Sequence, residues 1–155
     1  LSLISLDDSW TSEFYLSHPK NKFWTSDVDE IVETMRYILS ASDIKSLKTM
    51  PVNEKLEYIS NYWSEIDPTP ESKENELLDE FKSRVEFSNL NFSNLSKGYR
   101  SDRGRVYIIY GPPESVEKFS NYDGVYQVWN YTSGSSFVFI DRNGFGNFIL
   151  VRQTL

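Results

Sequence analysis

The sequence predicts an α+β fold in which three or four helices pack on one face of an antiparallel sheet of four or five strands, connected as a meander. Between residues 25 and 96, apolar residues recur every three or four positions, as they do along one face of a helix. From residue 105 onward, short runs of β-branched and aromatic residues alternate with turn residues. The 155 residues include ten Phe, ten Tyr and four Trp, which suffice for the core of one domain.

Residues 1–24 are expected to be the end of a preceding β-rich region or an irregular arm. Leu1, Leu3 and Leu6 fit one short strand, and the apolar residues that follow do not have helical spacing. The chain starts without an initiator Met, so we expect an excised or processed piece, a start that leaves room for a signal peptide or a lipid anchor upstream. His18, the only histidine, lies beside Pro19 and is expected to be a solvated loop residue.

The domain proper is expected over residues 25–155, with a helical part over 25–96 and a sheet part over 97–155. Ser26 is the predicted N-cap of the first helix, because acidic residues fill the turn after it. Pro51 suits the first turn of a helix, and Pro68 ends that helix, because residues before proline are pushed out of helical geometry. The predicted helices span residues 27–40, 42–47, 51–66 and 72–92.

The sheet part is predicted from five short β-type runs. They cover residues 105–110, 116–119, 125–131, 136–140 and 146–152. The segments between them contain Gly-Pro-Pro, Asn-Tyr-Asp-Gly, Thr-Ser-Gly-Ser and Asp-Arg-Asn-Gly, all of which favour turns. Because such connections are short, consecutive strands are expected to pair antiparallel and to leave one face for helices to cover.

Directly before the first predicted strand, segment 98–105 places one aspartate among three arginines. Asp102 can accept charge-assisted hydrogen bonds, and the arginines can hold a second carboxylate, a phosphate or the carbonyls of a turn. Three interpretations remain open: an ion network that joins Arg103 or Arg105 to carboxylates on the helices, binding of an anionic ligand or partner carboxylate, and catalysis with Asp102 as general base. The candidate binding or structural cluster comprises Gly98, Tyr99, Arg100, Ser101, Asp102, Arg103, Arg105, Asp67, Glu76 and Arg84.

Segment 98–114, Gly-Tyr-Arg-Ser-Asp-Arg-Gly-Arg-Val-Tyr-Ile-Ile-Tyr-Gly-Pro-Pro-Glu, resembles the signature of the GWxTD domain family, with Tyr99 in place of Trp and Ser101 in place of Thr. Residues 62–70, 75–76 and 81–85 resemble, in order and approximate spacing, the helical half of the same family of uncharacterised bacterial proteins. The resemblance implies no particular activity. It implies an exported protein of Bacteroidetes-type bacteria, periplasmic or associated with the outer membrane, of lipoprotein type, with β-rich regions ahead of this domain.

Composition excludes several classes of function. The net charge of −7 disfavours binding to nucleic acid or to an anionic membrane, because phosphate groups would be repelled. The absence of Cys excludes disulfides, thiolate nucleophiles and Cys-ligated zinc, and a single His suggests no first-row metal site. No apolar run approaches the roughly 20 residues of a membrane helix. We therefore predict no metal and no cofactor, and membrane contact only through an anchor outside this fragment.

The sequence favours a non-catalytic binding or assembly module of an exported, multidomain bacterial envelope protein, with other envelope proteins or other domains of the same chain as partners. Ser101 is a poor candidate nucleophile, because the only His lies far away in the amino-terminal loop. The alternative is a hydrolase acting on a cell-envelope polymer, with Asp102 and a helix carboxylate such as Asp67 or Glu76. The alternative requires Asp102 beside a second carboxylate in an open cleft, whereas the module requires Asp102 to be hydrogen-bonded within the fold.

Overall fold

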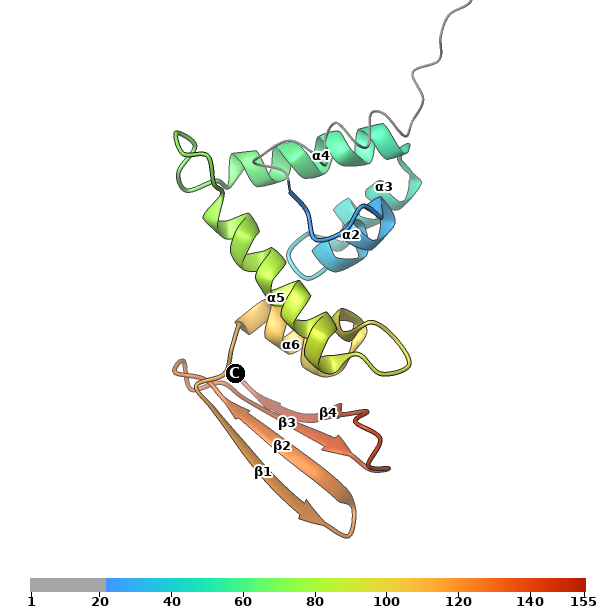
Figure 1. The fold of residues 1–155 in the computed structure, drawn as a ribbon, viewed down its shortest axis with the longest axis vertical. Helices are drawn as coiled ribbons and strands as arrows, with labels where there is room; N and C mark the ends of the chain where they lie inside the picture. The colour runs from blue at the N-terminus through green and yellow to red at the C-terminus, as the bar shows by residue number, and fades with distance from the viewer. Residues whose placement is uncertain (1–21) are drawn as a thin grey trace, which may run out of the picture. The chain divides into compact units, whose positions relative to one another are not determined.

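The computed structural model describes residues 22–155, which form two compact units, 22–83 and 84–155 (Figure 1). The described part is α+β, as predicted, with five α-helices, one 3-10 helix and a four-stranded antiparallel sheet. The elements are α2 (Val28–Met35), α3 (Ala41–Thr49), α4 (Val52–Glu65), α5 (Glu76–Phe92), the 3-10 helix η1 (Gly98–Arg100), α6 (Asp102–Tyr110), β1 (Ser115–Asn121), β2 (Gly124–Asn130), β3 (Ser136–Asp141) and β4 (Ile149–Thr154). His18 and all but the last three residues of the predicted arm lie outside the described residues.

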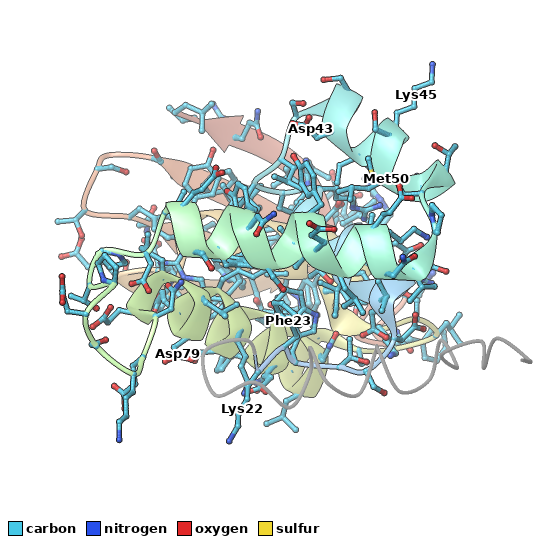
Figure 2. The ribbon with its side chains drawn as sticks, turned by 90° about the horizontal axis from the view of Figure 1, so that it is seen from above. Lys22, Phe23, Asp43, Lys45, Met50 and Asp79 are labelled. Carbon is cyan, nitrogen blue, oxygen red and sulfur yellow. The ribbon has the colours of Figure 1, made fainter. Side chains whose placement is uncertain are left out.

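The first unit packs α2, α3, α4 and the first turns of α5 around an apolar and aromatic core. Trp63 of α4 lies 5.4 Å from Phe81 of α5, between ring centroids, and Trp24 lies 5.2 Å from the same ring. Phe23 is also buried, whereas Lys22 and Lys45 extend away from the unit (Figure 2). Phe23, Trp63 and Phe81 are the buried aromatic residues of this core.

Side-chain caps explain where α2 and α5 begin. The Asp27 carboxylate accepts hydrogen bonds from the amides of Asp29 and Glu30, so α2 starts one residue later than a Ser26 cap predicts. Helix α5 begins at Glu76, instead of near Ser72 as predicted. Its start is set by buried Asn75, whose side chain accepts from the Leu78 amide and donates to the Trp63 carbonyl.

The second unit contains the sheet, whose strands follow one another in the order β1-β2-β3-β4 and pair antiparallel. The last turns of α5 and helix α6 cover one face, the inner face (Figure 1). Val106 of α6 is buried there against Trp129, Phe137 and Phe139. Alternation along β2 and β3 therefore sends large apolar residues inward, as expected for a sheet covered on one side.

The strand predicted over residues 105–110 is wrong, because this segment is the body of helix α6. The run Val-Tyr-Ile-Ile-Tyr has high β propensity, but three local features favour a helix here. The Ser101 hydroxyl caps the first turn by accepting from the Gly104 amide, Asp102 lies at the positive end of the helix dipole, and Val106 and Ile108 are buried. Packing and capping outweigh propensity, which differs by at most about 1 kcal/mol per residue. The other four predicted strands are confirmed as β1 to β4.

Candidate functional site

Asp102, the centre of the predicted cluster, joins helix α6 to the sheet. Its Oδ2 accepts a hydrogen bond of 2.7 Å from the backbone amide of Leu150 in β4, and its Oδ1 lies 3.6 Å from Arg105 Nη2. The Leu150 amide belongs to β4, which is an edge strand among residues 22–155, so its outward N–H groups have no partner strand within that range. The Asp102 carboxylate, at the N-terminus of α6, thus satisfies one outward N–H group of that edge. This hydrogen bond between helix and sheet, made to a backbone amide, is called the clasp below.

Two glycines allow close contacts between backbones around η1. A methyl group on Gly98 would overlap the carbonyl oxygen of Ser88 in α5. A methyl group on Gly104 would overlap the carbonyl oxygen of Gly98. Both positions therefore require glycine, because each contact is with backbone that cannot turn aside. The Ser101 hydroxyl completes the arrangement by donating to the Gly98 carbonyl.

Tyr99 anchors the 3-10 helix to α5. Its side chain is 1% exposed, and its backbone amide donates to Asn89 Oδ1 at 3.0 Å. The neighbouring Arg100 side chain donates from Nε to the Tyr99 hydroxyl at 3.0 Å. The aromatic ring thus fills the interior while its hydroxyl reaches a polar partner near the surface, an arrangement that suits tyrosine.

Arg103 lies between two aromatic rings and the β3–β4 loop. Its guanidinium carbon is 4.8 Å from the centroid of Phe92 and 4.1 Å from that of Phe148, and Nη2 donates to the Gly146 carbonyl. Burial lowers the pKa of Arg103, while the nearby carboxylate of Asp141 opposes this shift. Arg103 therefore contributes through stacking and loop attachment, for which the planar guanidinium is suited.

Arg84 lies at the opposite end of α6 from Asp102. Its Nη1 donates to the carbonyls of Ile108 and Ile109, at 3.1 and 3.3 Å, and so caps the C-terminal end of the helix. Next to it, the Tyr131 hydroxyl donates to the Gly111 carbonyl at 2.9 Å, and burial raises the pKa of this hydroxyl well above its ordinary value. Two members of the predicted cluster thus secure α6 at both ends.

Asp67 and Glu76 belong to the first unit, where they order the loop between α4 and α5. The Asp67 carboxylate accepts from the Thr69 amide, and Glu76 accepts from the Thr69 hydroxyl. The structure brings together the members of the cluster from Gly98 to Arg105, around the start of α6. Arg84, a residue of α5, contacts the C-terminal end of α6.

A polar groove of about 360 Å³ adjoins the clasp, between η1, the start of α6 and the β3–β4 loop. Its lining includes Arg100, Ser101, Asp102, Arg103 and Phe148. Asp102 is the one carboxylate among the described residues that line this groove. Within residues 22–155, no group of three or more His, Asp or Glu lies close enough together to hold a metal ion.

The face of the sheet opposite α6, called here the outer face, carries a second candidate surface. Its residues form three rows across the strands, set by the pairing register. The rows are Ser115–Asn130–Ser136–Thr154, Glu117–Val128–Val138–Arg152 and Phe119–Tyr126–Ile140–Ile149. Val151, at the irregularity in the β3–β4 pairing, lines a hollow of about 590 Å³ on this face.

Several large apolar side chains on the outer face remain accessible, although Ile140 is fully buried. Phe119 is 49% exposed, Val151 47% and Ile149 42%. Phe119 and Tyr126 stack in parallel with ring centroids 4.8 Å apart, so they form one flat aromatic surface at the β1 side. Sequence reasoning missed this face. The sequence signal for this face is the alternation in β2, where Tyr126 and Val128 point away from the side of Trp129. Only the pairing register, however, shows which residues of the four strands share a row.

Comparison with known families decides the identity of the domain: the GWxTD domain matches residues 2–154. The chain belongs to the GWxTD domain family. No curated protein matches the chain, and no solved structure does. No helix within residues 22–155 has both the length and the hydropathy needed to cross a bilayer.

In this GWxTD domain, each named position of the signature has a structural role. Gly98 permits the contact with α5, Tyr99 fills the core, Ser101 caps α6 and Asp102 bonds the sheet. Replacing Trp by Tyr and Thr by Ser preserves these roles, because a large aromatic ring and a capping hydroxyl are retained.

Proposed function

We propose that this chain is a non-catalytic binding or assembly module of an exported, multidomain bacterial envelope protein, and that it meets its partner through the outer face of the sheet. The observation that carries the proposal is the group of accessible apolar side chains on that face, Phe119, Ile149 and Val151. Soluble domains rarely leave a contiguous apolar surface open unless it binds something.

The use of the signature residues supports a module more than an enzyme. The Asp102 carboxylate accepts from the Leu150 amide, and Ser101 is engaged with the backbone of Gly98 and Gly104. A hydrolase with Asp102 as acid or base needs a second carboxylate across the substrate, and the adjoining groove has none among its described lining residues. These side chains stabilise the fold, which leaves binding as the function that the second unit supports best.

The cellular context belongs to the same proposal. We place the protein in the periplasm or at the outer membrane of a Bacteroidetes-type bacterium, attached if at all by a lipoprotein-type anchor outside this fragment. Its partners are then other envelope proteins or other domains of the same chain. A net charge of −7 favours a protein surface over nucleic acid or an anionic lipid.

A pair of photo-cross-linking variants tests the proposal in the full-length protein, in bacterial cells that export it. One variant carries a photoreactive residue in place of Val128 on the outer face, and the matched control carries it at Lys118, on the other face of neighbouring β1. We expect an adduct with a second polypeptide or domain in the envelope fraction from position 128, and none from position 118. No adduct at 128, or equal adducts at both positions, contradicts the proposal.

A further inference from the structure

We infer that the outer face binds a second copy of this chain, in a face-to-face dimer whose two-fold axis runs parallel to the strands between β2 and β3. This inference rests on the proposed function and names the partner of the same surface. The evidence is the order of charge and apolar side chains across the four strands.

The middle row of the outer face is acidic at one end and basic at the other. In the pairing register, Glu117 of β1 lies beside Val128, which lies beside Val138, which lies beside Arg152 of β4. Neighbouring strands are about 4.8 Å apart, so the two charged residues are roughly 14 Å apart and cannot pair within one copy. Asn130 donates to Glu117 Oε1 at 3.0 Å, which helps to hold the carboxylate at this face.

A two-fold axis parallel to the strands makes this row complementary to itself. The rotation exchanges β1 with β4, so that Glu117 of one copy faces Arg152 of the other, twice per dimer, and Val128 faces Val138. An axis perpendicular to the strands would instead place Glu117 over Glu117 and Arg152 over Arg152. Of these two axes, the charges therefore favour the one parallel to the strands.

The neighbouring row is apolar along its length and obeys the same symmetry. Phe119 then faces Ile149, so the two side chains most exposed in this row are covered together. Ile140, in the same row, is already fully buried within one copy and adds nothing to the interface. Paired sheets pack about 10 Å apart, with the strands of one sheet inclined by about 30° to those of the other. The long side chains of Glu117 and Arg152 can span this separation at the sheet edges. The polar row from Ser115 to Thr154 forms the rim.

Charge reversal tests the arrangement by sedimentation of the full chain over a range of concentrations. The unaltered chain is expected to dimerise. Glu117→Arg and Arg152→Glu, each alone, create two like-charge contacts and are expected to raise the dissociation constant of the dimer at least about tenfold. Mixing these two variants restores both opposite-charge contacts in a heterodimer, so the mixture is expected to associate as the unaltered chain does. The control is Lys118→Glu, a reversal on the same strand but on the other face, which is expected to leave the dimer intact.

Three results overturn the inference. The first is a chain that stays monomeric at all concentrations up to about 1 mM, the weak end of measurable affinity. The second is a dimer that neither charge reversal weakens, and the third is a pair of monomeric variants that do not associate when mixed. A monomeric chain that still forms the Val128 adduct with a different polypeptide leaves the proposed function standing and rejects only the second copy as the partner.

Discussion

Replacing Asp102 by Ala removes the hydrogen bond that joins α6 to β4, and we expect it to lower the free energy of unfolding by about 2–3 kcal/mol. The bond is short, at 2.7 Å, and its acceptor is ionised, which places it among the stronger hydrogen bonds at about 1.5–3 kcal/mol. The carboxylate also lies in the first turn of α6, where a negative charge adds about 0.3–1 kcal/mol. The 3.6 Å contact with Arg105 contributes little, because the two side chains are 37% and 42% exposed.

Urea unfolding measures the loss of stability, and hydrogen exchange at the Leu150 amide reports the bond itself. The Ala variant is expected to exchange faster at Leu150, while Asp102→Asn keeps an oxygen acceptor and is expected to lose roughly half as much stability. Glu114→Ala, at an exposed acidic residue of the same unit, is the control and is expected to change stability by less than about 0.5 kcal/mol. Unchanged stability together with unchanged exchange at Leu150 in the Ala variant would refute the clasp.

Three further perturbations test other parts of the second unit. Gly98→Ala forces a methyl group against the Ser88 carbonyl and is expected to cost about 3 kcal/mol in urea unfolding, whereas Ser96→Ala at an exposed position is expected to be nearly neutral; equal effects would contradict the packing argument. Arg84→Lys removes the planar fork that caps α6 and is expected to cost about 1 kcal/mol, with faster amide exchange in the last turn of the helix as the local readout. Burial raises the pKa of Tyr131, so the unfolded chain loses the hydroxyl proton first, near pH ~10, and the free energy of unfolding should fall as the pH rises beyond that value. Tyr131→Phe should make this fall less steep, and an unchanged slope would contradict a role of the buried hydroxyl.

The signature stretch shows both what local sequence can predict and where it misleads. The importance of Asp102 as a link between helix and sheet was predictable, because an ionised group beside a core element needs a partner. Its partner was not, since the Leu150 amide lies 48 positions along the chain. The secondary structure after it was predicted wrongly, because a run of β-branched and aromatic residues reads as a strand, and the Ser101 cap was the signal that pointed to a helix.

Arg103 is a second residue whose role depended on the tertiary structure. The sequence left an ion network and the binding of an anionic group open for this arginine. In the structure its side chain stacks between Phe92 and Phe148 and donates to the Gly146 carbonyl. Those groups come from α5 and from the β3–β4 segment, and no spacing along the chain indicates that they meet at this arginine.

By itself, the sequence determined the α+β class, the antiparallel meander and the family, because periodicity, turn residues and a signature motif are local properties. It also determined which residue types are available for chemistry, with one His and no Cys. Only the tertiary structure decided that residues 105–110 are helical, that the Asp102 carboxylate bonds β4, and that Glu117 and Arg152 end the same row of the outer face. These outcomes depend on packing and strand register between distant segments, and register is set by the burial of a whole face rather than by any one residue.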